Sequence, residues 1–135
     1  MANSFGSAPI PGSAQLQPQT TYLVLLNGPL ANHFFLLNRM RSLLGRSHPP
    51  YMTVDIDLTG CESNQPPTIS RHHAVIQWAN QKLQIMDLAS RNGTFVNGRQ
   101  LVPQGQKGPS EPAVLRAGSK IQLGALELTI IVAGD

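Results

Sequence analysis

The sequence predicts an all-β domain, a two-sheet sandwich or a barrel built from short strands. Short apolar or alternating runs recur along the chain, and turn residues separate them. The 12 Gly and 11 Pro among 135 residues favour turns, and apolar stripes with a helical period are almost absent. With 41% hydrophobic and 13% charged residues, the chain can bury one compact core, and a second core is unexpected.

The first segment, residues 1–19, is expected to be a flexible N-terminal tail. It is small and polar, with no apolar periodicity, and it contains Pro9, Pro11 and Pro18. It has no Lys or Arg and no long apolar run, so it does not match a secretory signal. The folded domain is therefore expected to span residues 20–133.

Six runs of β-branched or aliphatic residues are the clearest strands. In chain order they are residues 21–26, 33–37, 74–78, 82–87, 120–123 and 126–132. In the last run, Leu126, Leu128, Ile130 and Val132 share one face by the two-residue period of a strand. That face is expected to lie in the core.

The strongest local signal is a hairpin at Asn97-Gly98, between residues 94–96 and 99–101. A two-residue turn of this kind needs positive φ at both positions, which Asn and Gly tolerate best.

Three further segments, one strand and two loops, are predicted from less regular sequence patterns. Residues 52–58 alternate apolar and polar side chains and predict a half-exposed strand, whereas residues 61–68 and 102–112 are rich in Pro, Gln, Gly and Ser and predict long loops. A helix over residues 36–44 remains an alternative, because five apolar side chains there could form one stripe.

Polar residues cluster where the predicted strands end or begin, in segments 45–47, 70–73 and 91–94. In a β-sandwich such loops gather at the ends of the sheets, where a rigid scaffold can present a binding surface.

Four side chains of these segments suit a phosphorylated peptide. The guanidinium group of Arg46 or Arg71 can donate two parallel hydrogen bonds to a pair of phosphate oxygens, and the Ser70 hydroxyl can donate to a third oxygen. The Asn92 carboxamide can pair with a peptide main chain, which phosphate alone would not need.

The order of these segments is that of a known family. The motifs are Leu44-Gly45-Arg46-Ser47, Asp55-Ile56-Asp57-Leu58, Ile69-Ser70-Arg71-His72-His73-Ala74, Asp87-Leu88-Ala89-Ser90-Arg91-Asn92-Gly93-Thr94-Phe95-Val96-Asn97-Gly98 and Leu115-Arg116-Ala117-Gly118-Ser119-Lys120-Ile121-Gln122-Leu123-Gly124. The sequence resembles a forkhead-associated (FHA) domain over roughly residues 20–133.

The resemblance implies a two-sheet β-sandwich of about eleven strands, FHA or SMAD-like in architecture. It implies a non-catalytic module of Ser/Thr kinase signalling that binds a phosphothreonine-containing protein through its end loops. Arg46 and Ser70 would contact the phosphate, Arg71 would add a second phosphate contact, and Asn92 would contact the ligand backbone. The residues implied to be architectural are Gly45, His73, Gly93, Thr94, Asn97 and Gly98, with the histidine as a buried hydrogen-bonding brace.

One departure from the family pattern is the length of the stretch between Arg46 and Ser70. Residues 48–51 and 62–67 are the expected extra material. Because these loops flank the expected ligand, they leave the peptide preference open. The alternative function is a phosphate-independent scaffold or assembly domain that uses the same sandwich.

Other function classes are not favoured. His72 and His73 are adjacent, so on a strand they point to opposite faces and do not readily chelate one ion. Ser70 does not lie in a Gly-x-Ser-x-Gly nucleophile elbow of the kind found in hydrolases, so no enzyme activity is expected. No cofactor or metal site is expected either. Few aromatic residues are present for base stacking, and no unbroken apolar run of membrane-spanning length occurs, so no nucleic-acid or membrane partner is expected.

Cys61 is the single cysteine and is expected in a loop, where an exposed thiol could pair between molecules. With no intrachain disulfide available, an intracellular, cytoplasmic and monomeric module is the simplest expectation.

Overall fold

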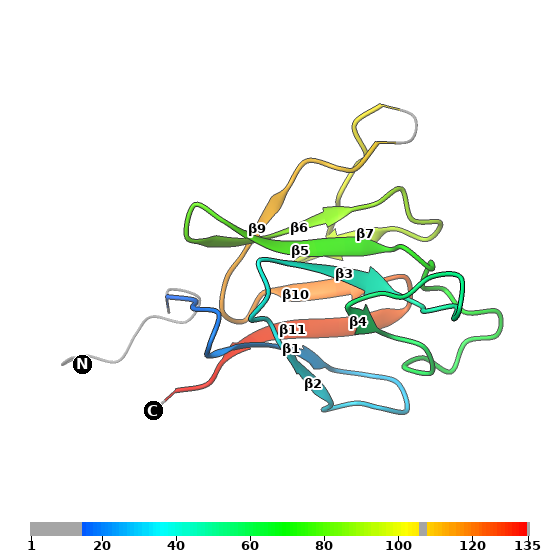
Figure 1. The fold of residues 1–135 in the computed structure, drawn as a ribbon, viewed down its shortest axis with the longest axis horizontal. Coiled ribbons are helices and arrows are strands. Elements are labelled where there is room, and N and C mark those ends of the chain that lie inside the picture. The colour runs from blue at the N-terminus through cyan, green and yellow to red at the C-terminus, as the bar shows by residue number, and fades with distance from the viewer. Residues whose placement is uncertain (1–14, 106–107, 135) are drawn as a thin grey trace.

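The computed structural model describes residues 15–105 and 108–134, and this part of the chain contains eleven strands and no helix. Figure 1 shows the strands arranged as two layers. In chain order they are β1 (Thr21–Leu25), β2 (Phe34–Leu36), β3 (Arg41–Gly45), β4 (Ile56–Asp57), β5 (Ala74–Ala79), β6 (Lys82–Asp87), β7 (Thr94–Val96), β8 (Arg99–Gln100), β9 (Ala113–Leu115), β10 (Lys120–Leu123) and β11 (Leu126–Val132). The predicted all-β sandwich is confirmed.

One sheet has six strands in the order β2-β1-β11-β10-β7-β8, and the other has five in the order β4-β3-β5-β6-β9. The pairing of β3 with β4 is parallel, and the other strand pairs of the two sheets are antiparallel. Alternate residues of β1, β6, β10 and β11 are buried between the sheets, as the pleat of a strand requires. Leu126, Leu128 and Ile130 are fully buried there as predicted, whereas Val132 is half-buried at the strand end.

The hairpin prediction is confirmed at Asn97 and Gly98. Their φ angles are +51° and +84°, and they join β7 to β8 with Val96 opposite Arg99.

The strand predicted over residues 52–58 is wrong for most of its length, because only Ile56–Asp57 joins a sheet. Side-chain oxygens accept hydrogen bonds from backbone N–H groups that would otherwise pair β4, if it were longer, with a neighbouring strand. The Asp55 carboxylate accepts the Leu43 N–H at 2.7 Å, and the Ser47 hydroxyl accepts the Val54 N–H at 3.1 Å. Short polar side chains of this kind compete with regular pairing.

The helical alternative over residues 36–44 is also wrong, because residues 41–45 form β3, which pairs with β5 on one side and β4 on the other. Its apolar residues do not form a stripe: Leu37 is buried, and Met40 is exposed. The sequence pattern predicted neither β3 nor β9 as a strand.

The segment just before residue 20, the expected start of the domain, lies against the sandwich. Leu16 packs against the core, and the Thr21 hydroxyl donates to the carbonyl of Gln17 at 2.6 Å. Residues 15–19 therefore contact the sandwich, and the rest of the expected tail, residues 1–14, lies outside the described residues.

Three loops meet at one end of the sandwich. They are the segments 46–55 after β3, 58–73 after β4 and 88–93 after β6. A backbone hydrogen bond joins the first two loops, because Arg46 N–H donates to the Arg71 carbonyl at 3.1 Å. The third loop is bonded to the β10–β11 turn, where Gly124 N–H donates to the Gly93 carbonyl at 3.1 Å. The long loops after β3 and β4 lie together beyond the same ends of the strands in Figure 1.

Candidate functional site

The end loops enclose a pocket of about 310 Å³. Its lining residues are Arg46, Pro67, Thr68, Ile69, Ser70, Arg71, Arg91 and Asn92. The structure therefore brings together all four residues selected from the sequence for a phosphopeptide, from three separate segments of the chain.

Arg46 is the first residue after β3 and is half-buried in the pocket wall. Its Nε donates to the carbonyl of Ile69 at 2.5 Å, so the orientation of the guanidinium is fixed while its terminal nitrogens remain available. Gly45 allows this approach, because a Cβ at that position would overlap the carbonyl of Arg71.

Ser70 is fixed at both its backbone and its side chain. Its N–H donates to Nδ1 of His73 at 2.9 Å, and its hydroxyl oxygen accepts the Arg91 N–H at 3.0 Å. The hydroxyl hydrogen is not needed for either bond, so it can be donated to an acceptor in the pocket.

Asn92 lies at the exposed rim. Its Nδ2 donates to the carbonyl of Thr68 at 2.9 Å, which fixes the carboxamide plane. The amide oxygen and the second N–H hydrogen remain for a ligand main chain.

His73 is fully buried and connects two of the loops. Nδ1 accepts from Ser70, so the proton lies on Nε2, which donates to the Gly93 carbonyl at 2.9 Å. Burial lowers the pKa of His73 below its ordinary value, since the charged imidazole would lose its hydration. The neutral ring is the form that both bonds require. His72, by contrast, is exposed.

The loop that carries Arg91 and Asn92 is shaped by Asp87, which is buried at the end of β6. Its carboxylate accepts the hydroxyl of Ser90 at 2.5 Å and that of Thr94 at 2.7 Å, and the Ser90 hydroxyl accepts the Gly93 N–H at 3.0 Å. Sequence reasoning missed Asp87 and Ser90, although an Asp three residues before a Ser is an ordinary turn signal.

Glu62 anchors the loop that was expected to be extra material. Its carboxylate accepts the N–H groups of Thr68 at 2.8 Å and Ile69 at 2.9 Å and the Thr68 hydroxyl at 2.6 Å. These two residues supply the carbonyls that Asn92 and Arg46 use. No pattern in the sequence points to this role for Glu62.

The suggestion of an exposed thiol at Cys61 is wrong. Only 2% of this residue is exposed, because it packs in the core beneath the loop. Burial raises the pKa of the thiol, and the nearby carboxylates of Asp57 and Glu62 act in the same direction.

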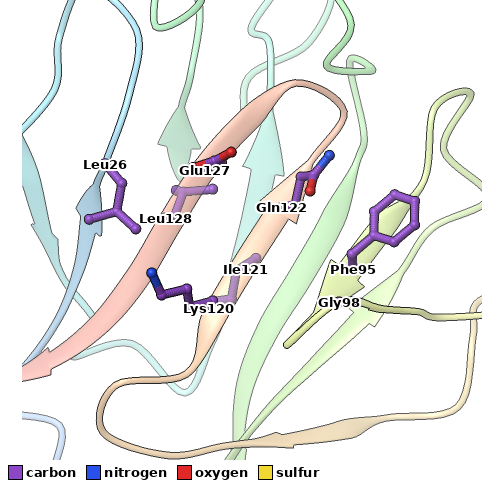
Figure 2. A pocket seen from close by; sticks show the side chains of 8 residues that line it. All are labelled: Leu26, Phe95, Gly98, Lys120, Ile121, Gln122, Glu127 and Leu128. Carbon is purple, nitrogen blue, oxygen red and sulfur yellow. The ribbon is translucent and has the colours of Figure 1, made fainter.

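A second hollow, of about 200 Å³, lies on the outer face of the six-stranded sheet. Figure 2 shows Phe95, Lys120, Gln122 and Glu127 spread along strands β7, β10 and β11 around it. It gathers one cation and one carboxylate, and none of the residues selected for phosphate lies there.

Within residues 15–105 and 108–134, no group of three or more His, Cys, Asp and Glu side chains is placed to hold a metal ion. The same part of the chain contains no helix long and apolar enough to cross a membrane.

A two-sheet sandwich with a basic pocket on its end loops defines a β-sandwich recognition domain. The chain belongs to the FHA domain family, whose model matches residues 43–124. FHA domains are non-catalytic interaction modules.

Two curated relatives are regulators or inhibitors by name. The chain is 32% identical to the glycogen accumulation regulator GarA of Mycobacterium tuberculosis over 122 residues, which cover 90% of this chain and 64% of GarA. It is 31% identical to the oxoglutarate dehydrogenase inhibitor of Corynebacterium glutamicum over 132 residues, which cover 97% of this chain and 79% of the inhibitor.

Among solved structures, the chain is similar to Mycobacterium tuberculosis EmbR in complex with a low-affinity phosphopeptide. The TM-score is 0.64 at 26% identity, and the match covers 87% of this chain and 26% of the EmbR chain.

Proposed function

We propose that this chain is a phosphothreonine-dependent protein-binding module of Ser/Thr kinase signalling, with no catalytic role. The observation that carries the proposal is the convergence of Arg46, Ser70, Arg71 and Asn92 on one pocket. The phosphopeptide complex of EmbR supports the ligand class, and the names of GarA and the oxoglutarate dehydrogenase inhibitor support a regulatory role.

The pocket chemistry suits a phosphate ester, which carries roughly −1.5 to −2 charges and three acceptor oxygens. Those oxygens can accept hydrogen bonds from the terminal nitrogens of Arg46, the Ser70 hydroxyl and the Arg71 guanidinium. The Asn92 carboxamide can then pair with the ligand main chain and fix its direction. The proposed module comprises the predicted domain, residues 20–133, together with residues 15–19 that pack on it, and acts as an intracellular monomer on a phosphoprotein.

The test is an NMR titration with peptide pools that are degenerate around a fixed phosphothreonine, beside matched phosphoserine and unphosphorylated pools. Binding that needs phosphate and prefers threonine, with shifts at Arg46, Ser70 and Asn92, is the expected result. Equal binding of the unphosphorylated pool would contradict the proposal.

A phosphate-independent assembly function is the second candidate, and an apolar hollow on the outer face of β1, β2 and β11 favours it. Tyr22, Val24, Phe34, Ile131 and Ala133 line this hollow of about 390 Å³, and Phe34 is 65% exposed. Partner binding that survives phosphatase treatment would support this second function.

A further inference from the structure

The proposed phosphate pocket contains a third arginine that the phosphate contacts do not require. Arg91 lines the pocket with Arg46 and Arg71, and none of the eight lining residues is acidic. In the part of the chain that the structure describes, the only ion pair joins Arg39 to Asp55, away from this pocket. Three guanidinium groups thus share one site without a carboxylate partner.

The carboxylate of Glu62 does not neutralise this charge by direct pairing. Both of its oxygens accept hydrogen bonds from Thr68 and Ile69, and Glu62 is not among the residues that line the pocket. Its negative charge therefore stabilises the loop rather than contacting the arginines.

The donors can be assigned to one phosphate without Arg91. Arg46, Ser70 and Arg71 together offer more donors than the three phosphate oxygens need, and the charge of a single phosphate, roughly −1.5 to −2, is less than that of three arginines. A singly phosphorylated ligand thus leaves positive charge in the pocket, and like charges that remain close together repel each other.

The backbone geometry fixes where the surplus charge lies. The Arg91 N–H donates to the Ser70 hydroxyl oxygen at 3.0 Å, and the next residue, Asn92, is the one expected to contact the ligand main chain. The exposed side chain of Arg91 therefore extends from a backbone position between Ser70, the proposed phosphate contact, and Asn92, the proposed contact to the ligand main chain. An anion near this position would belong to a ligand residue close to the phosphothreonine.

We propose that the pocket binds a second anionic group on the same ligand, within about three residues of the phosphothreonine, and that Arg91 is its specificity-determining contact. The group can be a carboxylate or a second phosphate, since a guanidinium pairs with either. This inference rests on the proposed phosphothreonine function.

The experiment is calorimetric titration of the whole chain with a peptide set built around one phosphothreonine. One arm places Asp at each of the three positions on either side, a second arm places phosphoserine there, and the reference peptide has alanine at all of them. Each peptide is titrated into the unchanged chain, Arg91→Gln and Arg116→Gln. Arg116 is the matched control, because it is an exposed arginine in the turn between β9 and β10 and is not a pocket residue.

The expected result is a gain in affinity of about fivefold or more for a peptide with the second anion, relative to the reference peptide. Arg91→Gln should abolish this gain in affinity, whereas Arg116→Gln should keep it. In the unchanged chain the gain should become smaller as the salt concentration is raised. A gain from phosphoserine alone would identify a second phosphate, and a gain from both arms would show that a carboxylate suffices.

Two results would overturn the inference. If the reference peptide binds as tightly as every doubly anionic peptide, the pocket has no second anion subsite, and the proposed phosphothreonine function still stands. The gain persisting in Arg91→Gln would assign it to another residue. If no phosphothreonine peptide bound at all, the proposed function would fail together with this inference, so the reference peptide separates the two failures.

Discussion

The Glu62 carboxylate accepts both the N–H and the hydroxyl of Thr68, at 2.8 and 2.6 Å. The Thr68 hydroxyl oxygen in turn accepts the Ala125 N–H at 2.8 Å, in the turn between β10 and β11. Glu62 thus connects the loop after β4, through Thr68, to the turn between two strands of the opposite sheet. The segment that was expected to be extra material is therefore attached to the sandwich beside the binding pocket.

The first prediction concerns Glu62→Ala. This change removes three hydrogen bonds to the segment that orients Arg46 and Asn92. We expect phosphothreonine peptide affinity to fall about tenfold, and the free energy of unfolding to fall by about 1–3 kcal/mol, because partly buried donors lose a charged acceptor. Titration and urea denaturation measure the two effects.

Glu62→Gln tests whether Glu62 acts by positioning. It keeps one oxygen acceptor, so it should recover part of the peptide affinity. Glu111→Ala, at an exposed acid outside the phosphate pocket, is the matched control and should bind as the unchanged chain does. Unaltered affinity in Glu62→Ala would show that the pocket does not depend on this anchor.

The second prediction concerns Arg46→Ala. Truncating a fully engaged charged contact costs about 2–5 kcal/mol, so phosphothreonine peptide affinity should fall by about thirtyfold or more. Arg46→Lys should recover only part of it, because lysine keeps the charge but not the planar pair of donors. Arg116→Ala should leave affinity unchanged. Full affinity in Arg46→Ala, with a normal melting temperature, would contradict the assignment of Arg46.

The third prediction concerns Gly45→Ala. The added methyl group would overlap the Arg71 carbonyl, so the loop after β4 must shift. We expect a loss of about 2–3 kcal/mol in the free energy of unfolding together with weaker peptide binding. At Gly134 an added Cβ meets nothing within 4 Å, which makes Gly134→Ala the control for urea denaturation. Equal stability of the two variants would show that the loop can move away without loss.

Features set by local chemistry could be predicted from the sequence. The Asn97-Gly98 turn needs only two residues that tolerate positive φ, and the alternation in residues 126–132 needs only the strand period. The clustering of Arg46, Ser70 and Asn92 also followed, because loops at strand ends gather at one end of a sandwich.

Features set by contacts distant in the chain could not be predicted. The Thr68 hydroxyl accepts a hydrogen bond from Ala125, 57 residues away, and no local pattern predicts that contact. For His73 the family resemblance implied a buried brace, but the local pattern did not identify Gly93, 20 residues away, as its partner. The failed strand prediction has the same cause, since Asp55 uses its carboxylate on the backbone of β3, 12 residues earlier. Alternation alone does not reveal which backbone donors a side chain will take.

The fourth prediction is a pH dependence of stability that comes from His73. Burial lowers its pKa from the ordinary value of 6.5, and this outweighs the Gly93 hydrogen bond and the charges of Asp87 and Glu62, which favour protonation. Below about pH 6.5 the unfolded chain therefore binds a proton that the folded chain does not. Stability contributed by this histidine is present above that pH and is lost as the pH falls toward the folded-state pKa.

The measurement is urea denaturation of the unchanged chain, His73→Gln and His72→Gln between pH 7.5 and 5.5. His72 is the exposed neighbour, so its variant should keep the full decline in stability on acidification. His73→Gln should be less stable at pH 7.5 but should show a smaller decline, because the titrating group is gone. Protonation of the folded chain would turn Nδ1 into a donor facing the Ser70 N–H, so loss of peptide affinity from this source should begin only at lower pH, near the folded-state pKa. An identical decline in all three proteins would exclude His73 as the source of the pH dependence.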